Sequence, residues 1–232
     1  MKTVADKIIA FNRKLQYEGP LPEGIRIMNP FRENEQVLPV SEQFYHKFYD
    51  DTHKRILILG INPGRLGSGA TGVPFTDTKR LAEKCGISIP GLHTHEPSSV
   101  FMYDMIDAYG RVDAFYGDVY ISSACPLGFV RVNEAGKEVN YNYYDSKALQ
   151  DAVLPFIEWN LQQQIAIGCN TATCFCLGTG KNFKFLADLN KRMRLFGRIV
   201  PLEHPRYIMQ YKLKSKQQYV DDYITKLKAA TA

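Results

Sequence analysis

Four short apolar runs separated by helical patterns constrain the fold of this chain more than any other feature. The runs that predict buried strands are residues 55–60, 119–123, 173–177 and 198–202. Helical spacing of apolar residues is found at about 1–16, 77–86, 98–110, 145–164, 180–195 and 214–229. Continuous apolar runs are typical of strands covered on both faces, and alternation with helices is typical of parallel strands joined by right-handed crossovers. We therefore predict an α/β fold, a three-layer α/β/α sandwich around a short, mainly parallel four-stranded sheet.

The rest of the sequence favours a single domain. No internal repeat, low-complexity tract or linker-like stretch divides the 232 residues, and a hydrophobic share of 45% is ample for a buried core. Residues 1–27 are expected to form an N-terminal helical extension, and residues 214–232 a basic C-terminal helix. Ser41 is expected to cap a short aromatic helix around residues 44–48.

The termini and the cysteines indicate where such a chain works. No stretch approaches the roughly 18 uninterrupted apolar residues of a membrane span. Residues 1–7 offer no signal-peptide core or cleavage site, so we expect a soluble, cytoplasmic protein without membrane contact. The cysteines are five in number, form no Cys-x-x-Cys pair and argue against a disulfide framework or a zinc site. We expect reduced thiols that mostly fill core space: Cys85, Cys125, Cys169, Cys174 and Cys176.

The positive charge of the chain is concentrated near its C-terminus. Residues 181–232 hold twelve Lys/Arg and four Asp/Glu, a net charge of 12 − 4 = +8, whereas the whole chain carries +5 and the remainder therefore −3. Such asymmetry suits a polyanionic partner. The alternative is a solvated surface helix.

The strongest local signal is the glycine-rich segment 60–75, directly after the first predicted buried strand. Ligands of parallel α/β sheets bind beyond the carboxyl ends of the strands, and glycines let a backbone approach a ligand closely. Residues 67–72 match the letters of a dinucleotide-binding fingerprint, but they begin well after the strand and run into Pro74. No Gly-Lys-Ser/Thr follows, which also excludes a phosphate-binding P-loop. A plain surface loop remains the alternative to a binding site.

This segment resembles the first motif of the single-strand-selective monofunctional uracil-DNA glycosylases, a branch of the uracil-DNA glycosylase superfamily. The branch carries Gly-Met-Asn-Pro-Gly and, further along, Gln-Thr-Gly-Val-Pro-Phe. The matching residues here are Gly60-Ile61-Asn62-Pro63-Gly64 and Thr71-Gly72-Val73-Pro74-Phe75. The likeness extends over most of residues 28–212, through Met28-Asn29-Pro30-Phe31, Cys125-Pro126-Leu127 and His204-Pro205-Arg206. Residues 204–211 also resemble a bacterial subfamily of this branch.

The resemblance implies a role for each matching residue. Asn62 would position the attacking water, and His204 would donate a hydrogen bond to the base as it gains negative charge. Phe75 would stack on a base flipped out of the DNA. Further pocket contacts would come from Gly60, Ile61, Pro63, Gly64 and Ser123. The chemistry needs neither a metal nor an organic cofactor.

The stretch after His204 has the composition of a nucleic-acid contact. Cations interleaved with aromatic rings suit phosphates and unstacked bases. The residues expected to bind DNA, single- or double-stranded, are Arg65, Arg206, Tyr207, Lys212 and Lys214. An amphipathic tail helix, to which Lys216 and Tyr211 also belong, is the alternative. No obligate protein partner is implied. The other histidines (46, 53, 93 and 95) are expected to be structural, and Cys125 to be core packing, not a nucleophile.

Two departures from the branch bear on specificity. Ser123 stands where the branch has an asparagine that reads the base, and a hydroxyl offers less than the paired donor and acceptor of a carboxamide. Arg206 directly follows Pro205, which shortens the segment that the branch wedges into the duplex.

These features predict a monofunctional DNA-repair enzyme that hydrolyses the N-glycosidic bond of uracil or a related damaged base. A catalytically weak or inactive nucleic-acid-binding module with the same fold is the alternative, and Ser123 is its best support. A hydrolase of free nucleosides is a third reading, disfavoured because a nucleoside offers the basic tail no phosphates.

Overall fold

The computed structural model describes residues 1–231, and its centre is a parallel sheet of four strands in the order β3-β2-β6-β7. The strands are β2 (Arg55–Gly60), β3 (Val119–Ser123), β6 (Cys169–Leu177) and β7 (Arg198–Leu202). All residues of β2 and β3 are buried. The predicted fold class is confirmed, as are the bounds of three strands. The fourth, β6, begins four residues earlier than predicted, and it pairs with β2 across a register shift between Ile56 and Leu57.

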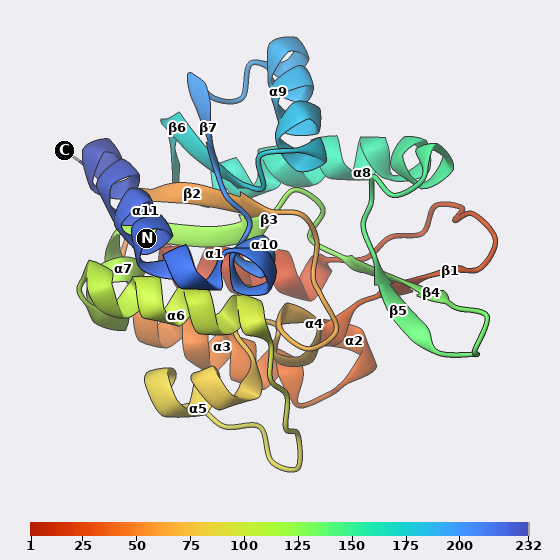
Figure 1. Ribbon diagram of the computed structural model, residues 1–232, viewed down its shortest axis with the longest axis horizontal. Coiled ribbons are helices and arrows are strands. Elements are labelled where there is room, and N and C mark those ends of the chain that lie inside the picture. Colours follow the sequence, from red (N-terminus) through yellow and green to blue (C-terminus); the bar gives the residue numbers. More distant parts are fainter. Residues whose placement is uncertain (232) are drawn as a thin grey trace.

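Helices cover both faces of this sheet (Figure 1). On one side lie α8 (Lys147–Ala166) and α9 (Lys181–Met193), which pack against β6. The other side holds α3 (Val37–Phe48), α6 (Pro97–Tyr109) and α7 (Arg111–Asp118). The three layers that the sequence predicts are therefore present.

The N- and C-terminal helices pack on this second layer. Helix α1 (Val4–Lys14) begins at a capping box formed by Thr3 and Asp6, and it contacts α3. Helix α11 (Lys216–Thr231) follows a short 3₁₀ turn, η1 (Leu213–Ser215), and packs against α6. The predicted C-terminal helix extends to residue 232, which lies outside the described residues.

A second, antiparallel sheet was not predicted. Its order is β1-β4-β5, formed by β1 (Ile25–Met28), β4 (Gly128–Val132) and β5 (Glu138–Tyr141), and it lies beside the main sheet in Figure 1. These strands are short and partly exposed, so they lack the apolar runs that reveal the central strands. At its inner end Gly128 approaches the Pro63 carbonyl so closely that a Cβ there would lie 2.7 Å from that oxygen. The sheet therefore packs directly on the glycine-rich segment.

Several helix predictions need correction. Ser41 does not cap a helix: it is buried within α3, which begins at Val37, and it accepts a hydrogen bond from Asn12 Nδ2. Residues 68–71 form one helical turn, α4 (Ser68–Thr71), where a loop was expected. The helices without a predicted counterpart are α2 (Pro30–Glu33), α7 and α10 (Pro205–Tyr211). Helix α5 (Thr78–Cys85) matches its prediction to within a residue.

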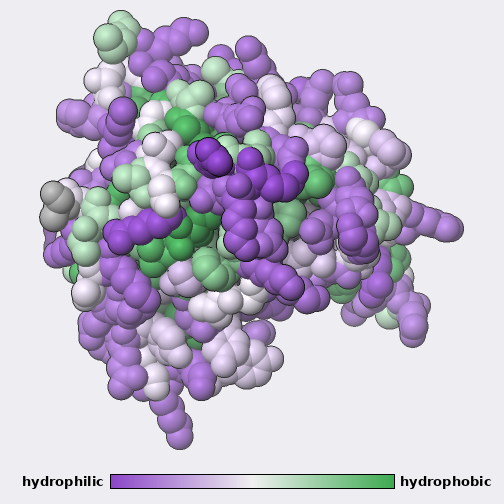
Figure 2. Space-filling view, turned by 90° about the horizontal axis from the view of Figure 1, so that it is seen from above, coloured by the Kyte–Doolittle hydropathy of each residue, from purple (hydrophilic) through white to green (hydrophobic). Residues whose placement is uncertain are grey.

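The surface is mostly polar. In Figure 2, hydrophilic side chains project over much of one face, and hydrophobic surface shows chiefly in the recesses between them. Among residues 1–231, no helix combines the length and the apolar character needed to cross a membrane.

Candidate active site

A cavity of about 410 Å³ lies at the carboxyl ends of the parallel strands. Its walls come from the segments that follow β2, β6 and β7, from the end of β3, and from the segment before α6. The second sheet adds Asn140, and the segment after it adds Asn142 and Tyr144. Since roughly 300–1,000 Å³ is usual for sites that enclose small ligands, the cavity can hold a nucleobase.

The structure brings most of the predicted site residues to this cavity. The predicted residues that line it are Ile61, Asn62, Pro63, Gly64, Phe75, Ser123, His204, Arg206 and Tyr207. Gly60 lies just outside the lining, where a Cβ would come within 2.8 Å of the Phe75 ring. Arg65, Lys212 and Lys214 are exposed and do not line the cavity.

The side-chain amide of Asn62 is held from two directions. Its Nδ2 donates to the Tyr141 carbonyl at the end of β5, at 3.2 Å. Its Oδ1 accepts the backbone N–H of Tyr143, at 3.1 Å. Nδ2 also donates to the Pro63 carbonyl at 3.4 Å, so main-chain carbonyls meet the amide protons, and one lone pair of Oδ1 remains free for a ligand or water. The unpredicted second sheet therefore fixes the orientation of the residue that the sequence singles out most strongly.

His204 is the N-cap of α10, and its ring is a neutral donor. Its Nδ1 accepts the backbone N–H of Arg206 at 3.1 Å, so in the neutral ring the proton is on Nε2. Burial, together with the nearby Arg206 charge, lowers the pKa of His204 to about 4. At neutral pH the ring thus carries no charge and presents Nε2–H as its free donor.

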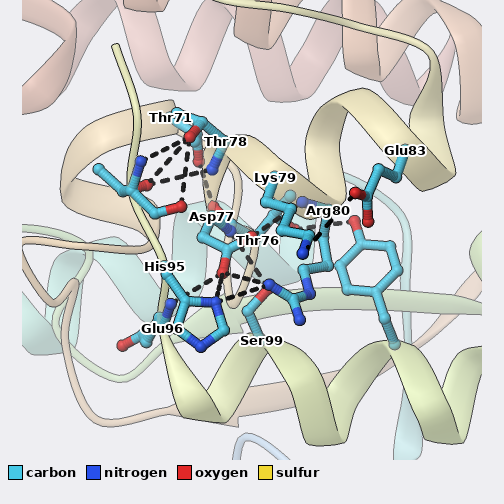
Figure 3. Close-up of polar contacts among 12 residues, drawn as sticks. Thr71, Thr76, Asp77, Thr78, Lys79, Arg80, Glu83, His95, Glu96 and Ser99 are labelled. Carbon is cyan, nitrogen blue, oxygen red and sulfur yellow. Dashed lines mark hydrogen bonds and ion pairs between the residues drawn. The ribbon is translucent and has the colours of Figure 1, made fainter.

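Phe75 forms a wall of the cavity next to His204, with ring centroids 5.9 Å apart and planes tilted by 53°. Its backbone adopts a left-handed conformation with φ 54, which costs energy for a residue with a Cβ. The Thr71 hydroxyl stabilises this turn: it donates to the Thr76 carbonyl at 2.7 Å (Figure 3). It also accepts the Val73 N–H at 3.2 Å. The ring is therefore placed by its own chain segment.

Ser123 ends β3 and is paired in register with Gly60 of β2. It is buried and lines the cavity. Its carbonyl accepts a hydrogen bond from Gln164 Nε2 of α8, which leaves the hydroxyl as its remaining polar group. Ser123 therefore presents its hydroxyl at the cavity, and its contact with a base stays a prediction.

Glu96, which the sequence did not indicate, also lines the cavity. It precedes α6 as the N-cap residue, but its side chain makes no capping bond. The pKa of this carboxyl is raised to about 7, chiefly by burial and also by the Asp77 charge, while the Arg206 charge opposes the rise. Glu96 follows a polar segment without strand or helix pattern, so no sequence signal reveals it. Asn140 and Lys181 are further lining residues that were missed.

Exposed cations and rings surround the mouth of the cavity. Tyr207 and Tyr211 of α10 lie 5.3 Å apart between centroids and are 39% and 70% exposed. Lys216, in contrast, pairs with Asp104 of α6 at 2.6 Å, so part of the C-terminal charge is neutralised. The positive surface near the cavity is therefore smaller than the net charge of residues 181–232 suggests.

The cysteines do not take part in the site. All five are free and buried. Burial raises the pKa of Cys125 to about 12, which makes its thiol a poor nucleophile. Within residues 1–231, no three His, Cys, Asp or Glu side chains cluster as metal ligands would.

Comparison with known proteins assigns the class. The sequence profile of the Uracil DNA glycosylase superfamily matches residues 46–228, and the chain belongs to this superfamily. Its structure is similar to the crystal structure of wild-type SMUG2 from Pedobacter heparinus, with a TM-score of 0.97 and 59% sequence identity. The similarity covers 100% of this chain and 99% of the other. No curated protein gives a significant match.

Proposed function

We propose that this protein is a monofunctional DNA glycosylase that hydrolyses the N-glycosidic bond of uracil or a related damaged base during base excision repair. The observation that carries the proposal is the pair formed by an oriented Asn62 amide and a neutral His204 donor on one cavity. Membership of the superfamily and the likeness to SMUG2 support it.

In this reaction the base is flipped out of the stack and enters the cavity, where Phe75 stacks on it. The bond between C1′ and the base nitrogen breaks, and both electrons leave with the base. His204 Nε2–H donates to a base oxygen as negative charge develops there, a contact that is stronger in the transition state than in the substrate. A neutral donor suits this task because its proton stays on the ring.

The sugar becomes oxocarbenium-like as the bond breaks, and water then adds to C1′. Asn62 orients this water through the lone pair of Oδ1 that its backbone bonds leave free. Arg65, Arg206, Tyr207, Lys212 and Lys214 would hold the DNA around the mouth of the cavity through phosphates and stacked bases.

A nucleic-acid-binding module that has lost useful catalysis is the second candidate, and Ser123 favours it. A serine hydroxyl cannot offer both a donor and an acceptor to uracil from fixed positions, as an asparagine can. An assay for abasic sites on oligonucleotides with different modified bases separates the two functions. We expect the parent protein to cleave at least one of them, and Ser123→Asn to raise cleavage of uracil relative to other bases. If neither protein cleaves any base, the binding module becomes the better interpretation.

A further inference from the structure

The proposed reaction needs a proton acceptor that Asn62 cannot supply. A water molecule that bonds to C1′ must lose a proton, and a carboxamide has no useful basicity. We propose that the Glu96 carboxylate is the general base of the reaction: it takes the proton from the attacking water as the water oxygen bonds to C1′. This inference rests on the proposed function, and it adds a third catalytic side chain to Asn62 and His204.

The position of Glu96 fits this role. Its carboxyl lies against the loop that carries Asn62: a Cβ on Gly64 would be 3.4 Å from Oε1, and one on Gly67 only 2.1 Å from Oε2. Asn140 Nδ2 approaches the same Gly64 position at 3.5 Å. Glycine at 64 and 67 therefore makes room for a carboxylate beside the loop that would position the water.

Of the two carboxylates that line the cavity, Glu96 is the one whose oxygens accept no hydrogen bond within the described residues. The cavity has a second one, Glu203, but its oxygens accept the Thr179 hydroxyl at 3.3 and 3.4 Å and the His204 N–H at 3.3 Å. Within residues 1–231 the side chain of Glu96 accepts no hydrogen bond and forms no salt bridge. A carboxylate that lines a cavity, has a shifted pKa and bonds to no other side chain is suited to a functional role.

Asp77, fully buried, anchors Glu96 through the backbone (Figure 3). One carboxylate oxygen of Asp77 accepts the Glu96 N–H at 2.8 Å and Arg80 Nη1 at 3.2 Å, and the other caps α5 through the Arg80 N–H. The Asp77 N–H donates to Ser99 of α6 at 3.2 Å. Asp77 follows Phe75 by two residues, so one buried carboxylate joins the segment that would stack on the base to the segment that carries Glu96.

The charges around Glu96 set the pH at which it can act. Burial and the neighbouring Asp77 raise its pKa to about 7, while Arg206 lowers it. Because a general base works best when its pKa is near the working pH, this carboxyl suits neutral conditions. The other titratable groups that line the cavity or flank Asp77 are Tyr144, Lys181, Glu203, His204, Tyr207, Tyr211, Arg80 and His95. Of the two histidines, His204 has a pKa of about 4 and stays neutral through the range in which Glu96 titrates.

The test is single-turnover cleavage of a uracil-containing single-stranded oligonucleotide, with enzyme in excess, from about pH 5 to about pH 9. The parent rate should fall as the pH drops below about 7, because Glu96 takes up a proton. Glu96→Gln should lower the rate at high pH by about 10²–10⁴-fold, the usual contribution of a general base, and should abolish this fall. Glu203→Gln is the matched control and should keep the pH-dependent fall.

Arg206→Gln tests the same claim without a change at Glu96. Loss of the positive charge raises the pKa of Glu96, so the fall in rate should begin at higher pH. If thermal unfolding shows that Glu96→Gln does not fold, the pH profile of Arg206→Gln still tests the role of Glu96. Either of two results would overturn the role of Glu96: an unshifted pH profile in Arg206→Gln, or a Glu96→Gln that keeps the parent's rate and profile. Neither result would overturn the glycosylase function. A parent that cleaves no base overturns both.

Discussion

The charged side chains near the two ends of strand β2 differ in whether they have partners. At its start, Arg55 is 1% exposed and fully compensated: it donates to Asp51 at 2.5 and 2.7 Å and to the carbonyls of His53 and Tyr116. Beyond its carboxyl end, Glu96 has no such partner. The Arg55 guanidinium holds the pKa of Asp51 below its usual range, whereas burial raises that of Glu96.

This contrast indicates that the start of β2 contributes to stability and that the residues beyond its carboxyl end contribute to function. Buried charges that are satisfied on all sides belong to the structural end, which anchors β2 to the chain around it. The carboxyl end collects an unpartnered carboxyl, a neutral histidine and the left-handed Phe75. Strain and shifted pKa values of this kind concentrate where a protein acts on a ligand. Substitutions at the two ends should therefore affect different properties.

Of the substitutions that compare the two ends of β2, His204→Ala at the functional end should have the larger effect on the rate. Loss of one preorganised donor to a developing anion costs about 10²–10³-fold in rate. Binding of DNA and the melting temperature should change little, since the one hydrogen bond of the ring is a local contact with the Arg206 N–H. Single-turnover cleavage, paired with binding of an uncleavable oligonucleotide, measures both properties. Equal losses in cleavage and binding would show that His204 holds DNA and does not serve the chemical step.

Arg55→Met should lower the stability of the protein and leave its rate of cleavage unchanged. The change keeps an unbranched stem but leaves the buried Tyr116 carbonyl without its donor, at a cost of about 1–3 kcal/mol in the free energy of unfolding. The rate per folded molecule should stay that of the parent. Urea unfolding followed by tryptophan fluorescence checks the first expectation, and cleavage at low temperature checks the second. Loss of activity in a folded Arg55→Met would show that the start of β2 also serves the reaction, which contradicts the difference between the two ends.

The basic surface near the cavity should contribute a salt-dependent affinity. Replacing Arg206, Lys212 and Lys214 together by Ala should lower the dependence of log affinity on log salt by about 2, given about 0.7 per phosphate contact on single strands. Fluorescence anisotropy with a labelled oligonucleotide at several salt concentrations measures the slope. A triple variant that binds like the parent would show that these residues only form a solvated surface.

The smallest effect is expected on stability, from Glu96→Gln. Between the ordinary pKa of 4.5 and about 7 the folded protein keeps a proton that the unfolded chain has released. Stability conferred by this group is therefore lost as the pH rises through that range. Glu96→Gln removes the loss, so its melting temperature should exceed the parent's above pH 7. The difference should vanish near pH 4, and a constant difference would contradict the shifted pKa.

The sequence predicted the central sheet well because its strands are short apolar runs with no competing helical period. Strands β2, β3 and β7 match to the residue. The second sheet was not predicted because its strands carry polar and exposed residues, such as Arg131 and Val132, and depend on tertiary contacts for their pairing. Helix α7 was hidden because only Gly110, with φ 143, separates it from α6.

The site was predictable where residues are close in sequence to a strand end. Asn62, Ser123 and His204 follow or end parallel strands, and the topology alone brings such positions together. Glu96 and Asp77 lie between helices and meet through packing, so spacing in the sequence does not show their relation. The contacts that orient Asn62 come from the second sheet and were hidden for the same reason.

The most direct test of the account is single-turnover cleavage of a uracil-containing oligonucleotide by the parent and by Asn62→Ala. Asn62 is the residue whose orientation the structure fixes most fully, and its proposed partner is a water molecule, not the DNA. We expect the parent to produce abasic sites. Asn62→Ala should bind the oligonucleotide equally well but cleave it at least about 10²-fold more slowly. Cleavage by Asn62→Ala at the parent's rate would contradict the proposed role of Asn62 in catalysis.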